Sequence, residues 1–192
     1  MTSPATTLAP ADVRRLMTAL GRRRSAVRDT VIVLLSFKAG LRAGEIASLD
    51  WAMVLGANRR VADYLQLPGR VVKYGHGRRV PLHSELKTSL TALHSLQDHP
   101  TSGPVIRSQR GGAFTAKSIV NWFKERYTEL GMTGCSSHSG RRTFITRAAR
   151  AVSRAGGSLR DVQELAGHRA LTTTERYIAG DRDAQRKLVR ML

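Results

Sequence analysis

Two pairs of residues in this sequence have the types and spacing needed to bind a phosphate group. His138 and Arg141 are three residues apart at the start of a predicted helix, so they share a face, and the helix dipole adds its positive end there. Arg42 opens a short predicted helix, and Glu45 lies one turn later, where it can orient the guanidinium. Each pair alone is a weak signal, because HxxR is common and such Arg-Glu pairs are usually surface ion pairs.

Three further residues could take part in chemistry on a phosphate. Lys73 lies beside a glycine-rich hairpin tip, His168 follows Gly167 at the end of a short predicted helix, and Tyr177 lies one short helix later. Each has an ordinary alternative. A lysine at a hairpin tip is usually solvated, a Gly-His pair usually ends a helix, and a helical tyrosine usually belongs to the core or its rim.

The order and spacing of these residues together resemble the active-site signature of the tyrosine recombinase (phage integrase) family. The resemblance covers residues from about 10 to 180 and is specific, because four motifs occur in the right order. The four similar segments are Gly40-Leu41-Arg42-Ala43-Gly44-Glu45-Ile46, Lys73-Tyr74-Gly75-His76-Gly77-Arg78-Arg79-Val80-Pro81-Leu82, His138-Ser139-Gly140-Arg141-Arg142-Thr143-Phe144, and Leu165-Ala166-Gly167-His168 with Thr172-Thr173-Thr174-Glu175-Arg176-Tyr177.

The resemblance implies that Tyr177 attacks a DNA phosphodiester and becomes linked to the 3′ phosphate. A free tyrosine has a pKa of about 10, so it needs a cationic pocket and a base, for which His138 is the candidate. Lys73 is the candidate acid for the leaving 5′-hydroxyl.

Two arginines and a histidine suit the charge of the reacting phosphate. Arg42 and Arg141 can hold its oxygens with forked donors, and His168 can donate to a non-bridging oxygen. Glu45 matches the supporting acidic residue of the family. These groups take the place of metal ions, so neither a metal nor a cofactor is expected, and rejoining needs no ATP.

Hydrophobic periodicity predicts a mainly α-helical fold with a small antiparallel sheet (α+β). Helices are expected over 10–21, 27–37, 43–49, 84–96, 115–130 and 139–154, with a short one from Ser158 to Gly167 and another, capped by Thr172 or Thr173, that contains Tyr177. The region 50–82 reads as the sheet, and Leu96 is expected to point inward. The predicted layout is a loose N-terminus at 1–9, a catalytic domain at 10–180 and a tail at 181–192.

The charge of the chain favours a polyanionic partner. Its 32 Lys and Arg outnumber its 14 Asp and Glu, for a formal net charge of +18. Double-stranded DNA is the expected partner; an anionic membrane is less favoured, because the basic residues are spread along the chain. Candidate DNA contacts are Arg22, Arg23, Arg24, Arg78, Arg79, Lys117, Asn121, Arg142 and Arg147, and the alternative for each is a solvated surface residue.

The remaining features concern location and assembly. A single cysteine, Cys135, excludes a disulfide within the chain, and no apolar run is long enough to cross a bilayer, so a cytoplasmic protein associated with the nucleoid is expected. The tail could dock on a neighbouring protomer or fold back on its own core. Few residues precede the first helix, so the chain is either an isolated catalytic domain or similar to short members such as the fimbrial invertases.

Three functions fit these observations. The first is a site-specific recombinase of the integrase, resolvase or invertase type, as found in mobile elements. The second is a type IB topoisomerase, which uses the same chemistry to relax DNA. The third is a DNA-binding regulator that kept the fold without catalysis; the intact set of catalytic residue types argues against it.

Overall fold

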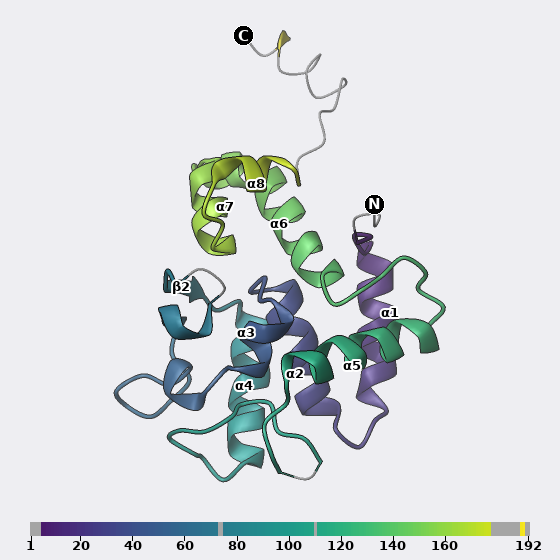
Figure 1. Ribbon diagram of the computed structural model, residues 1–192, viewed down its shortest axis with the longest axis vertical. Coiled ribbons are helices and arrows are strands. Elements are labelled where there is room, and N and C mark those ends of the chain that lie inside the picture. Colours follow the sequence, from purple (N-terminus) through teal and green to yellow (C-terminus); the bar gives the residue numbers. More distant parts are fainter. Residues whose placement is uncertain (1–4, 73–74, 110, 178–188, 191–192) are drawn as a thin grey trace.

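The computed structural model describes residues 5–72, 75–109, 111–177 and 189–190. Within these ranges the chain is mainly helical with one two-stranded sheet, as predicted (Figure 1). The α-helices are α1 (Pro10–Gly21), α2 (Ala26–Phe37), α3 (Ala43–Ala47), α4 (Ser84–Leu96), α5 (Ala116–Glu129), α6 (Ser139–Ala151), α7 (Leu159–Ala166) and α8 (Leu171–Glu175). Short 3-10 turns are η1 (Trp51–Met53), η2 (Gly69–Val71) and η3 (Val152–Ala155).

Helix α2 forms the centre of the main hydrophobic core. Its residues from Val31 to Leu35 are buried, because α1, α3, α4 and α6 all contact this helix. The continuous apolar run in the sequence is therefore a helix buried all round rather than an amphipathic one. Helix α5 packs on α3, and its Trp122 and Phe123 are buried in the main core, which completes the body that supports the first arginine segment.

The sheet is smaller than the sequence predicts. Strands β1 (Tyr64–Leu67) and β2 (Arg78–Pro81) pair antiparallel, with Leu65 opposite Val80 and both side chains buried. Residues 50–63 instead form η1 and a loop, because the Asp50 carboxylate accepts hydrogen bonds from Ala52 N and Gly103 N, both at 2.9 Å. Lys73, in the connection between the strands, lies outside the described residues.

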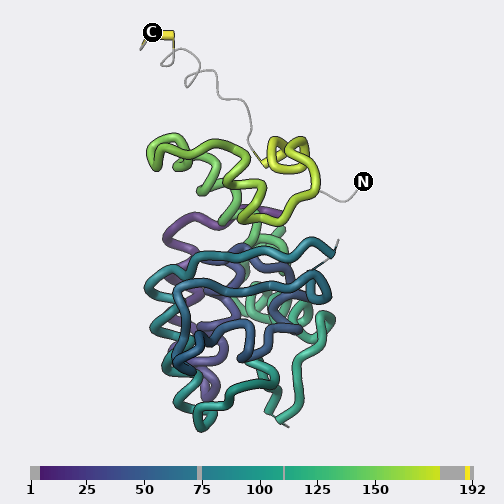
Figure 2. The backbone as a smooth tube through the Cα atoms, turned by 90° about the vertical axis from the view of Figure 1, so that its left-hand side faces the viewer, coloured from purple at the N-terminus to yellow at the C-terminus, as the bar shows by residue number. Residues whose placement is uncertain are grey.

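A second, smaller hydrophobic cluster is formed by α6, η3, α7 and the segment around α8. Ile145, Val162 and Ala166 are its buried members, and Tyr177 packs against them. Figures 1 and 2 show α6, α7 and α8 grouped at one end of the molecule, beyond the body made by α1 to α5. The segment with the candidate nucleophile thus has a core of its own.

Several helix ends agree with the sequence and three details do not. Thr115 Oγ1 accepts a hydrogen bond from Ser118 N at 3.1 Å and caps α5, and Ser158 precedes α7 as expected. Helix α8, however, follows Ala170, which has an extended backbone, so neither Thr172 nor Thr173 caps it and Tyr177 lies two residues beyond its end. The α6 helix also ends at Ala151, where the chain tightens into η3.

The other differences concern residues expected to be buried or loose. Leu96 is 67% exposed, because it closes the last turn of α4 beyond the core that covers Leu86, Leu90 and Leu93. Residues 5–9 are anchored rather than loose: Leu8 is buried, and its N–H donates to Thr143 Oγ1 at 3.0 Å. Most of the predicted tail at 181–192 lies outside the described residues.

Candidate active site

Arg141 joins two parts of the molecule that are distant in sequence. It lies in the first turn of α6, is 3% exposed, and donates from Nη1 to Gly40 O at 2.5 Å and from Nη2 to Ala166 O at 2.6 Å. Burial and the neighbouring Arg42 lower the pKa of Arg141 to about 10. The guanidinium therefore stays protonated at neutral pH while it links the start of the first arginine segment to the end of α7.

Close packing beneath Arg141 depends on Gly140. A Cβ atom at this position would lie 2.8 Å from the ring of Phe37 and against Ser36 Oγ, so only a glycine lets the start of α6 approach the end of α2 this closely. One of the two residues between His138 and Arg141 is therefore set by packing, and the close approach lets Arg141 bond Gly40 at the start of the first arginine segment.

Arg42 is bonded to Glu45 through both its backbone and its side chain. Arg42 precedes α3; its backbone N–H donates to Glu45 Oε2 at 2.8 Å and its Nη1 donates to Oε1 at 3.1 Å. Glu45 is only 2% exposed and also receives two hydrogen bonds from Arg78. Burial alone would raise the pKa of Glu45, but Arg78 and then Arg42 outweigh it, so the pKa lies below its usual value and the carboxylate stays ionised.

His168 lies next to Tyr177 because of a left-handed turn. Gly167 ends α7 with a φ of 62°, and the chain then reverses so that the His168 ring stacks on the Tyr177 ring, with centroids 5.5 Å apart and planes at 23°. The Nδ1 atom of His168 lies 3.0 Å from the hydroxyl of buried Thr174. Burial, followed by the charges of Arg141, Arg42 and Arg78, lowers the pKa of His168 to about 4, so the imidazole is neutral at physiological pH.

Tyr177 is half-buried and is held by contacts of both its ring and its backbone. Beyond the stacking with His168, the Arg142 guanidinium lies 5.5 Å from the centre of its ring. Its backbone N–H donates to Thr174 O at 3.0 Å, and its carbonyl accepts from Thr146 Oγ1 at 3.4 Å. His138, by contrast, is exposed; it precedes α6, and its carbonyl accepts a bond from Arg142 N at 2.8 Å.

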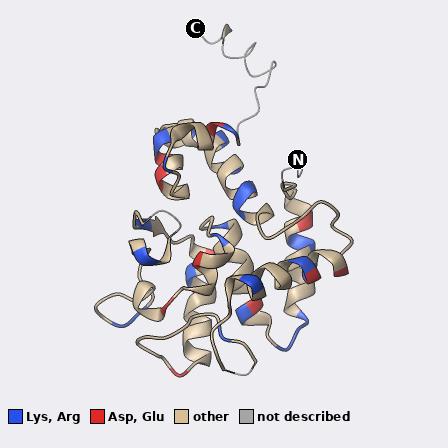
Figure 3. Ribbon diagram, in the orientation of Figure 1, with Lys and Arg blue, Asp and Glu red and all other residues tan. Residues whose placement is uncertain are grey.

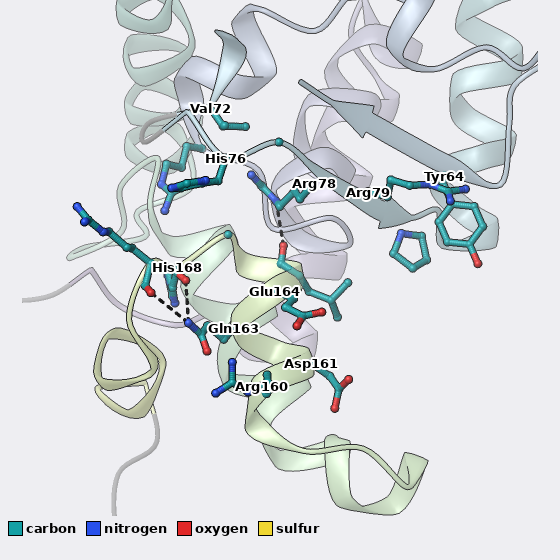
Figure 4. A pocket seen from close by; sticks show the side chains of 16 residues that line it. Tyr64, Val72, His76, Arg78, Arg79, Arg160, Asp161, Gln163, Glu164 and His168 are labelled. Atoms are coloured by element: carbon teal, nitrogen blue, oxygen red, sulfur yellow. Dashed lines mark hydrogen bonds between the residues drawn. The ribbon is translucent and has the colours of Figure 1, made fainter. Parts of the chain in front are cut away.

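A cleft of about 850 Å³ opens between the sheet and α7, and several of the candidate residues reach it (Figure 4). Arg42, Arg78 and His168 line it together with Arg79, Arg160 and Arg169. Asp161 and Glu164 also contribute to the wall, so cations outnumber acids there. A cleft of this composition suits an anionic chain such as the DNA backbone.

The predicted DNA contacts occupy different environments. Arg22, Arg23 and Arg24 are exposed in the turn between α1 and α2, at the end of the molecule opposite α6 to α8 (Figures 1 and 2). Arg79 is exposed, lines the cleft and stacks over Tyr64 at 4.6 Å. Arg78 differs from all of these, because its side chain is 7% exposed and bound within the protein.

The remaining predicted contacts lie on two helices. Lys117 and Asn121 are exposed on one face of α5, whereas Trp122 on the same helix is buried. Arg147 is exposed on α6 and donates to Leu8 O at 3.3 Å, and Arg142 lies over Tyr177. Figure 3 shows Lys and Arg on both parts of the molecule rather than on one element.

Sequence reasoning missed three residues that the fold brings to the site. Thr174 is the hydrogen-bonding partner of His168, and Arg160 and Arg169 line the cleft. Thr174 is one of three consecutive threonines, so its type and position do not distinguish it from Thr172 and Thr173 without the turn at Gly167.

The described residues offer neither a cluster of metal ligands nor a helix that could span a membrane. The part of the chain that the structure covers has no group of three or more His, Cys, Asp or Glu side chains that could hold a metal ion. The helices in those same ranges are too short or too polar to cross a membrane.

Curated relatives agree with the motifs. The chain is 30% identical over 160 residues to tyrosine recombinase XerC of Nitrobacter winogradskyi. The aligned region covers 80% of this chain and 46% of that protein. It is 28% identical over 169 residues to XerC of Actinobacillus pleuropneumoniae serotype 7, covering 86% of this chain and 51% of that protein. The chain thus spans about half the length of these relatives.

Solved structures share the fold. The Tn1549 transposon integrase in complex with transposon right end DNA superposes with a TM-score of 0.75 at 18% identity, over 100% of this chain and 67% of that one. The XerA recombinase superposes with a TM-score of 0.71 at 20% identity, over 98% of this chain and 66% of that one. The integrase from mycobacterium phage Brujita superposes with a TM-score of 0.61 at 27% identity, over 97% of this chain and 57% of that one.

A family model covers almost the whole chain. The model described as the Phage integrase family matches residues 6–183, a range that contains Arg42, Lys73, the His138/Arg141 pair, His168 and Tyr177. The match includes both hydrophobic clusters and the cleft between the sheet and α7. With the motifs, the geometry and the comparisons in agreement, the chain belongs to the Phage integrase family.

Proposed function

We propose that this chain is the catalytic domain of a site-specific tyrosine recombinase, which cuts and rejoins double-stranded DNA through a covalent 3′-phosphotyrosine at Tyr177. Residues 10–180 form the catalytic domain in this proposal, flanked by 1–9 and 181–192. The observation on which it depends is the convergence of the two arginine segments, α7 and Tyr177: Arg141 bonds both Gly40 and Ala166, and His168 stacks on Tyr177.

In the proposed cleavage step the phenolic oxygen of Tyr177 attacks the phosphorus and the bond to the 5′ oxygen breaks. The tyrosine proton passes to His138 as base, and the leaving 5′-hydroxyl receives a proton from Lys73. Arg42 and Arg141 neutralise the charge that builds up on the non-bridging oxygens. Attack by a new 5′-hydroxyl reverses the step, so the energy of the phosphodiester bond is kept.

The low pKa of His168 defines its part in this step. A neutral imidazole has one N–H, and a proton on Nε2 allows Nδ1 to accept the hydrogen bond of the Thr174 hydroxyl. The Nε2–H is then free to donate to a non-bridging oxygen of the phosphate. His168 acts as a hydrogen-bond donor rather than as a third fixed cation in this scheme.

We also propose the partners that this activity requires. The substrate is double-stranded DNA, bound by the cationic cleft, by the half-buried Arg142 and by the exposed candidates Arg22, Arg23, Arg24, Arg79, Lys117, Asn121 and Arg147. Other copies of the chain complete the DNA-bound assembly, as for the lambda integrase, which has been solved as a dimer bound to a core site. Such a protein works where the DNA is, in the cytoplasm and on the nucleoid.

The alternatives have less support. The relatives and structures named above are recombinases and integrases, which favours recombination over the relaxation performed by a type IB topoisomerase. Relaxation of a supercoiled plasmid that lacks any selected target site would favour the topoisomerase. DNA binding without any adduct would favour the non-catalytic regulator.

The covalent intermediate provides the direct test. A pool of nicked suicide duplexes with a randomised central sequence is incubated with the protein, and SDS-resistant protein–DNA adducts are isolated and sequenced. We expect recovery of a preferred sequence and of a DNA-linked peptide that contains Tyr177. Tyr177→Phe should abolish the adduct while it leaves the affinity for the recovered duplex nearly unchanged, and an adduct that persists in this variant would overturn the assignment.

A further inference from the structure

Arg78 uses every nitrogen of its guanidinium within the protein. Its Nη1 and Nη2 donate to the two carboxylate oxygens of Glu45 at 2.8 and 3.0 Å, and its Nε donates to Leu165 O at 3.1 Å. The bond to α7 is visible in Figure 4. With a side chain that is 7% exposed, Arg78 has the fixed forked geometry of an internal ion pair rather than that of a surface residue awaiting DNA.

Arg78 and its two partner residues belong to separate segments that provide the candidate site. Arg78 is the first residue of β2, shortly after Lys73 in the sequence, and Glu45 on α3 is the residue that holds Arg42. Leu165 lies in the last turn of α7, beside Ala166, whose carbonyl binds Arg141. One side chain therefore touches the supports of both arginines.

Arg78 also packs against the turn that places His168. A Cβ atom at Gly167 would lie 2.9 Å from Arg78 Nη1 and 3.1 Å from its Cδ, so the backbone of Gly167 rests directly on the arginine side chain. Gly167 ends α7 in the left-handed conformation, and His168 follows it. A change in the place of Arg78 would be transmitted to the His168 ring through this contact.

The bonds from Arg78 and Arg141 also link the two hydrophobic clusters. Val162 and Ala166 of α7 belong to the second cluster, whereas Leu41 and Ile46 beside Arg42 belong to the main one. Arg78 reaches from β2 to the last turn of α7, and Arg141 reaches from α6 to the neighbouring carbonyl. The orientation of α7 relative to α3 thus depends on polar bonds with fixed directions.

We propose that Arg78 is a positioning residue, which holds Glu45 and Arg42 in register with the α7 end that presents His168. The proposal rests on the recombinase function proposed above and assigns to Arg78 a role other than contact with DNA. Lysine at this position would keep the charge, but it could not satisfy three acceptors in two directions.

A matched pair of substitutions separates positioning from general stability. Arg28 is also half-buried, donates to a buried carboxylate (Asp29, at 3.0 and 2.7 Å) and to a main-chain carbonyl (Arg107 O, at 3.2 Å), but it lies on α2. At saturating DNA, we expect Arg78→Gln to slow adduct formation by about 10- to 100-fold. Arg28→Gln should leave the rate within about 2-fold of the parent when folding is matched by circular dichroism.

Binding measurements distinguish this role from a phosphate contact. For a positioning residue, the Kd of Arg78→Gln for the recovered duplex and its dependence on salt should match those of the parent. For a phosphate contact, the rate at saturating DNA would be unchanged, the Kd would rise, and the slope of log K against log salt would fall by about 1. That second outcome would overturn the proposal.

A titration that needs no DNA tests the same contact independently of activity. Among the described residues, three charged groups face His168: Arg141 of α6, Arg42 before α3 and Arg78 of β2. Thr174 and Tyr177, which follow His168 in the sequence, also contact its ring. Because the Arg78 cation disfavours the imidazolium, Arg78→Gln should raise the pKa of His168 measured by NMR, with the signal assigned from His168→Asn. Arg28→Gln should leave the pKa of His168 unchanged. An unchanged pKa of His168 in folded Arg78→Gln would contradict the arrangement, even if the parent protein forms no adduct.

Arg78→Lys separates charge from geometry and also serves if Arg78→Gln does not fold. The lysine keeps a cation near His168, so the pKa of His168 should remain close to that of the parent. The rate of adduct formation should still be reduced, because the fork to Glu45 and the bond to Leu165 O are lost. Full activity in Arg78→Lys would show that charge alone is sufficient and would overturn the positioning role.

Discussion

The imidazole of His168 stacks on the ring of Tyr177, with ring centres 5.5 Å apart and planes at 23°. Both residues are bonded to Thr174 of the intervening helix α8, whose hydroxyl meets His168 Nδ1 and whose carbonyl accepts the N–H of Tyr177. The hydrogen-bond donor proposed for the phosphate and the candidate nucleophile are thus held beside one another by contacts within the chain. The relationship leads to the first two predictions.

The hydroxyl of Thr174 should set the tautomer of His168. Removing it by Thr174→Val keeps the volume but leaves Nδ1 without its partner, so the N–H is no longer directed to Nε2. We expect adduct formation at saturating DNA to slow about 10-fold, which corresponds to the free energy of one hydrogen bond. Thr174→Ser, which keeps the hydroxyl, should remain near the parent rate; equal rates for the valine and serine variants would contradict the role.

Folding stability should depend on pH through His168. Its pKa is about 4 in the folded chain, below the ordinary 6.5, so the unfolded chain binds more protons between these values. The contribution of the neutral ring is fully present above pH 6.5 and is lost as the pH falls toward 4, by on the order of 1–3 kcal/mol. Urea unfolding across this range should show a smaller decline for His168→Gln than for the parent, and parallel curves would contradict the low pKa.

Gly140 should tolerate no side chain. The Cβ of Gly140→Ala would press on the Phe37 ring at 2.8 Å and on Ser36, so we expect a loss of about 1–3 kcal/mol in the free energy of unfolding. Gly21→Ala provides the control, because it lies at the end of α1 with nothing within 4 Å of the added atom. Urea denaturation of both variants measures the difference, and a stable Gly140→Ala would argue against the close approach of α6 to α2.

Chelation of metal ions should leave cleavage unchanged. In the proposed mechanism Arg42 and Arg141 provide the positive charge that meets the phosphate, so adduct formation should proceed at the same rate in EDTA as in magnesium. A magnesium-dependent restriction enzyme in the same buffer confirms that chelation is complete. A strict requirement of the adduct for magnesium would mean that the guanidiniums alone do not meet the charge of the transition state.

The sequence predicts most helices of this fold because their signals are local. Proline and threonine at helix starts, glycine at helix ends and the apolar run in α2 all report on their own neighbours. The same reasoning fails where a distant residue decides. The Asp50 carboxylate accepts a hydrogen bond from Gly103 N, and the chain at this point forms a turn where a strand was expected. Leu96 follows the helical spacing but is exposed, because it lies beyond the partners that cover Leu86.

The candidate site divides in the same way. Arg42 and Glu45 are three residues apart in the sequence, so their contact follows from the spacing of a helix. Arg78 and Glu45 are 33 residues apart, and the sequence of a basic hairpin does not indicate that they meet. The sequence therefore groups Arg78 with the possible DNA contacts. Thr174 is missed for a related reason: its meeting with His168 requires the reversal at Gly167.

The bonds of Arg141 have a practical consequence for making inactive forms of the protein. Its two terminal nitrogens satisfy the carbonyls of Gly40 and Ala166, which would be left without partners in the alanine variant, at about 1–3 kcal/mol for each buried group. A variant without this arginine is therefore expected to lose part of its architecture together with the phosphate contact proposed for it. A silent competitor for DNA sites is better built at Tyr177, where the phenylalanine ring can keep the stacking on His168.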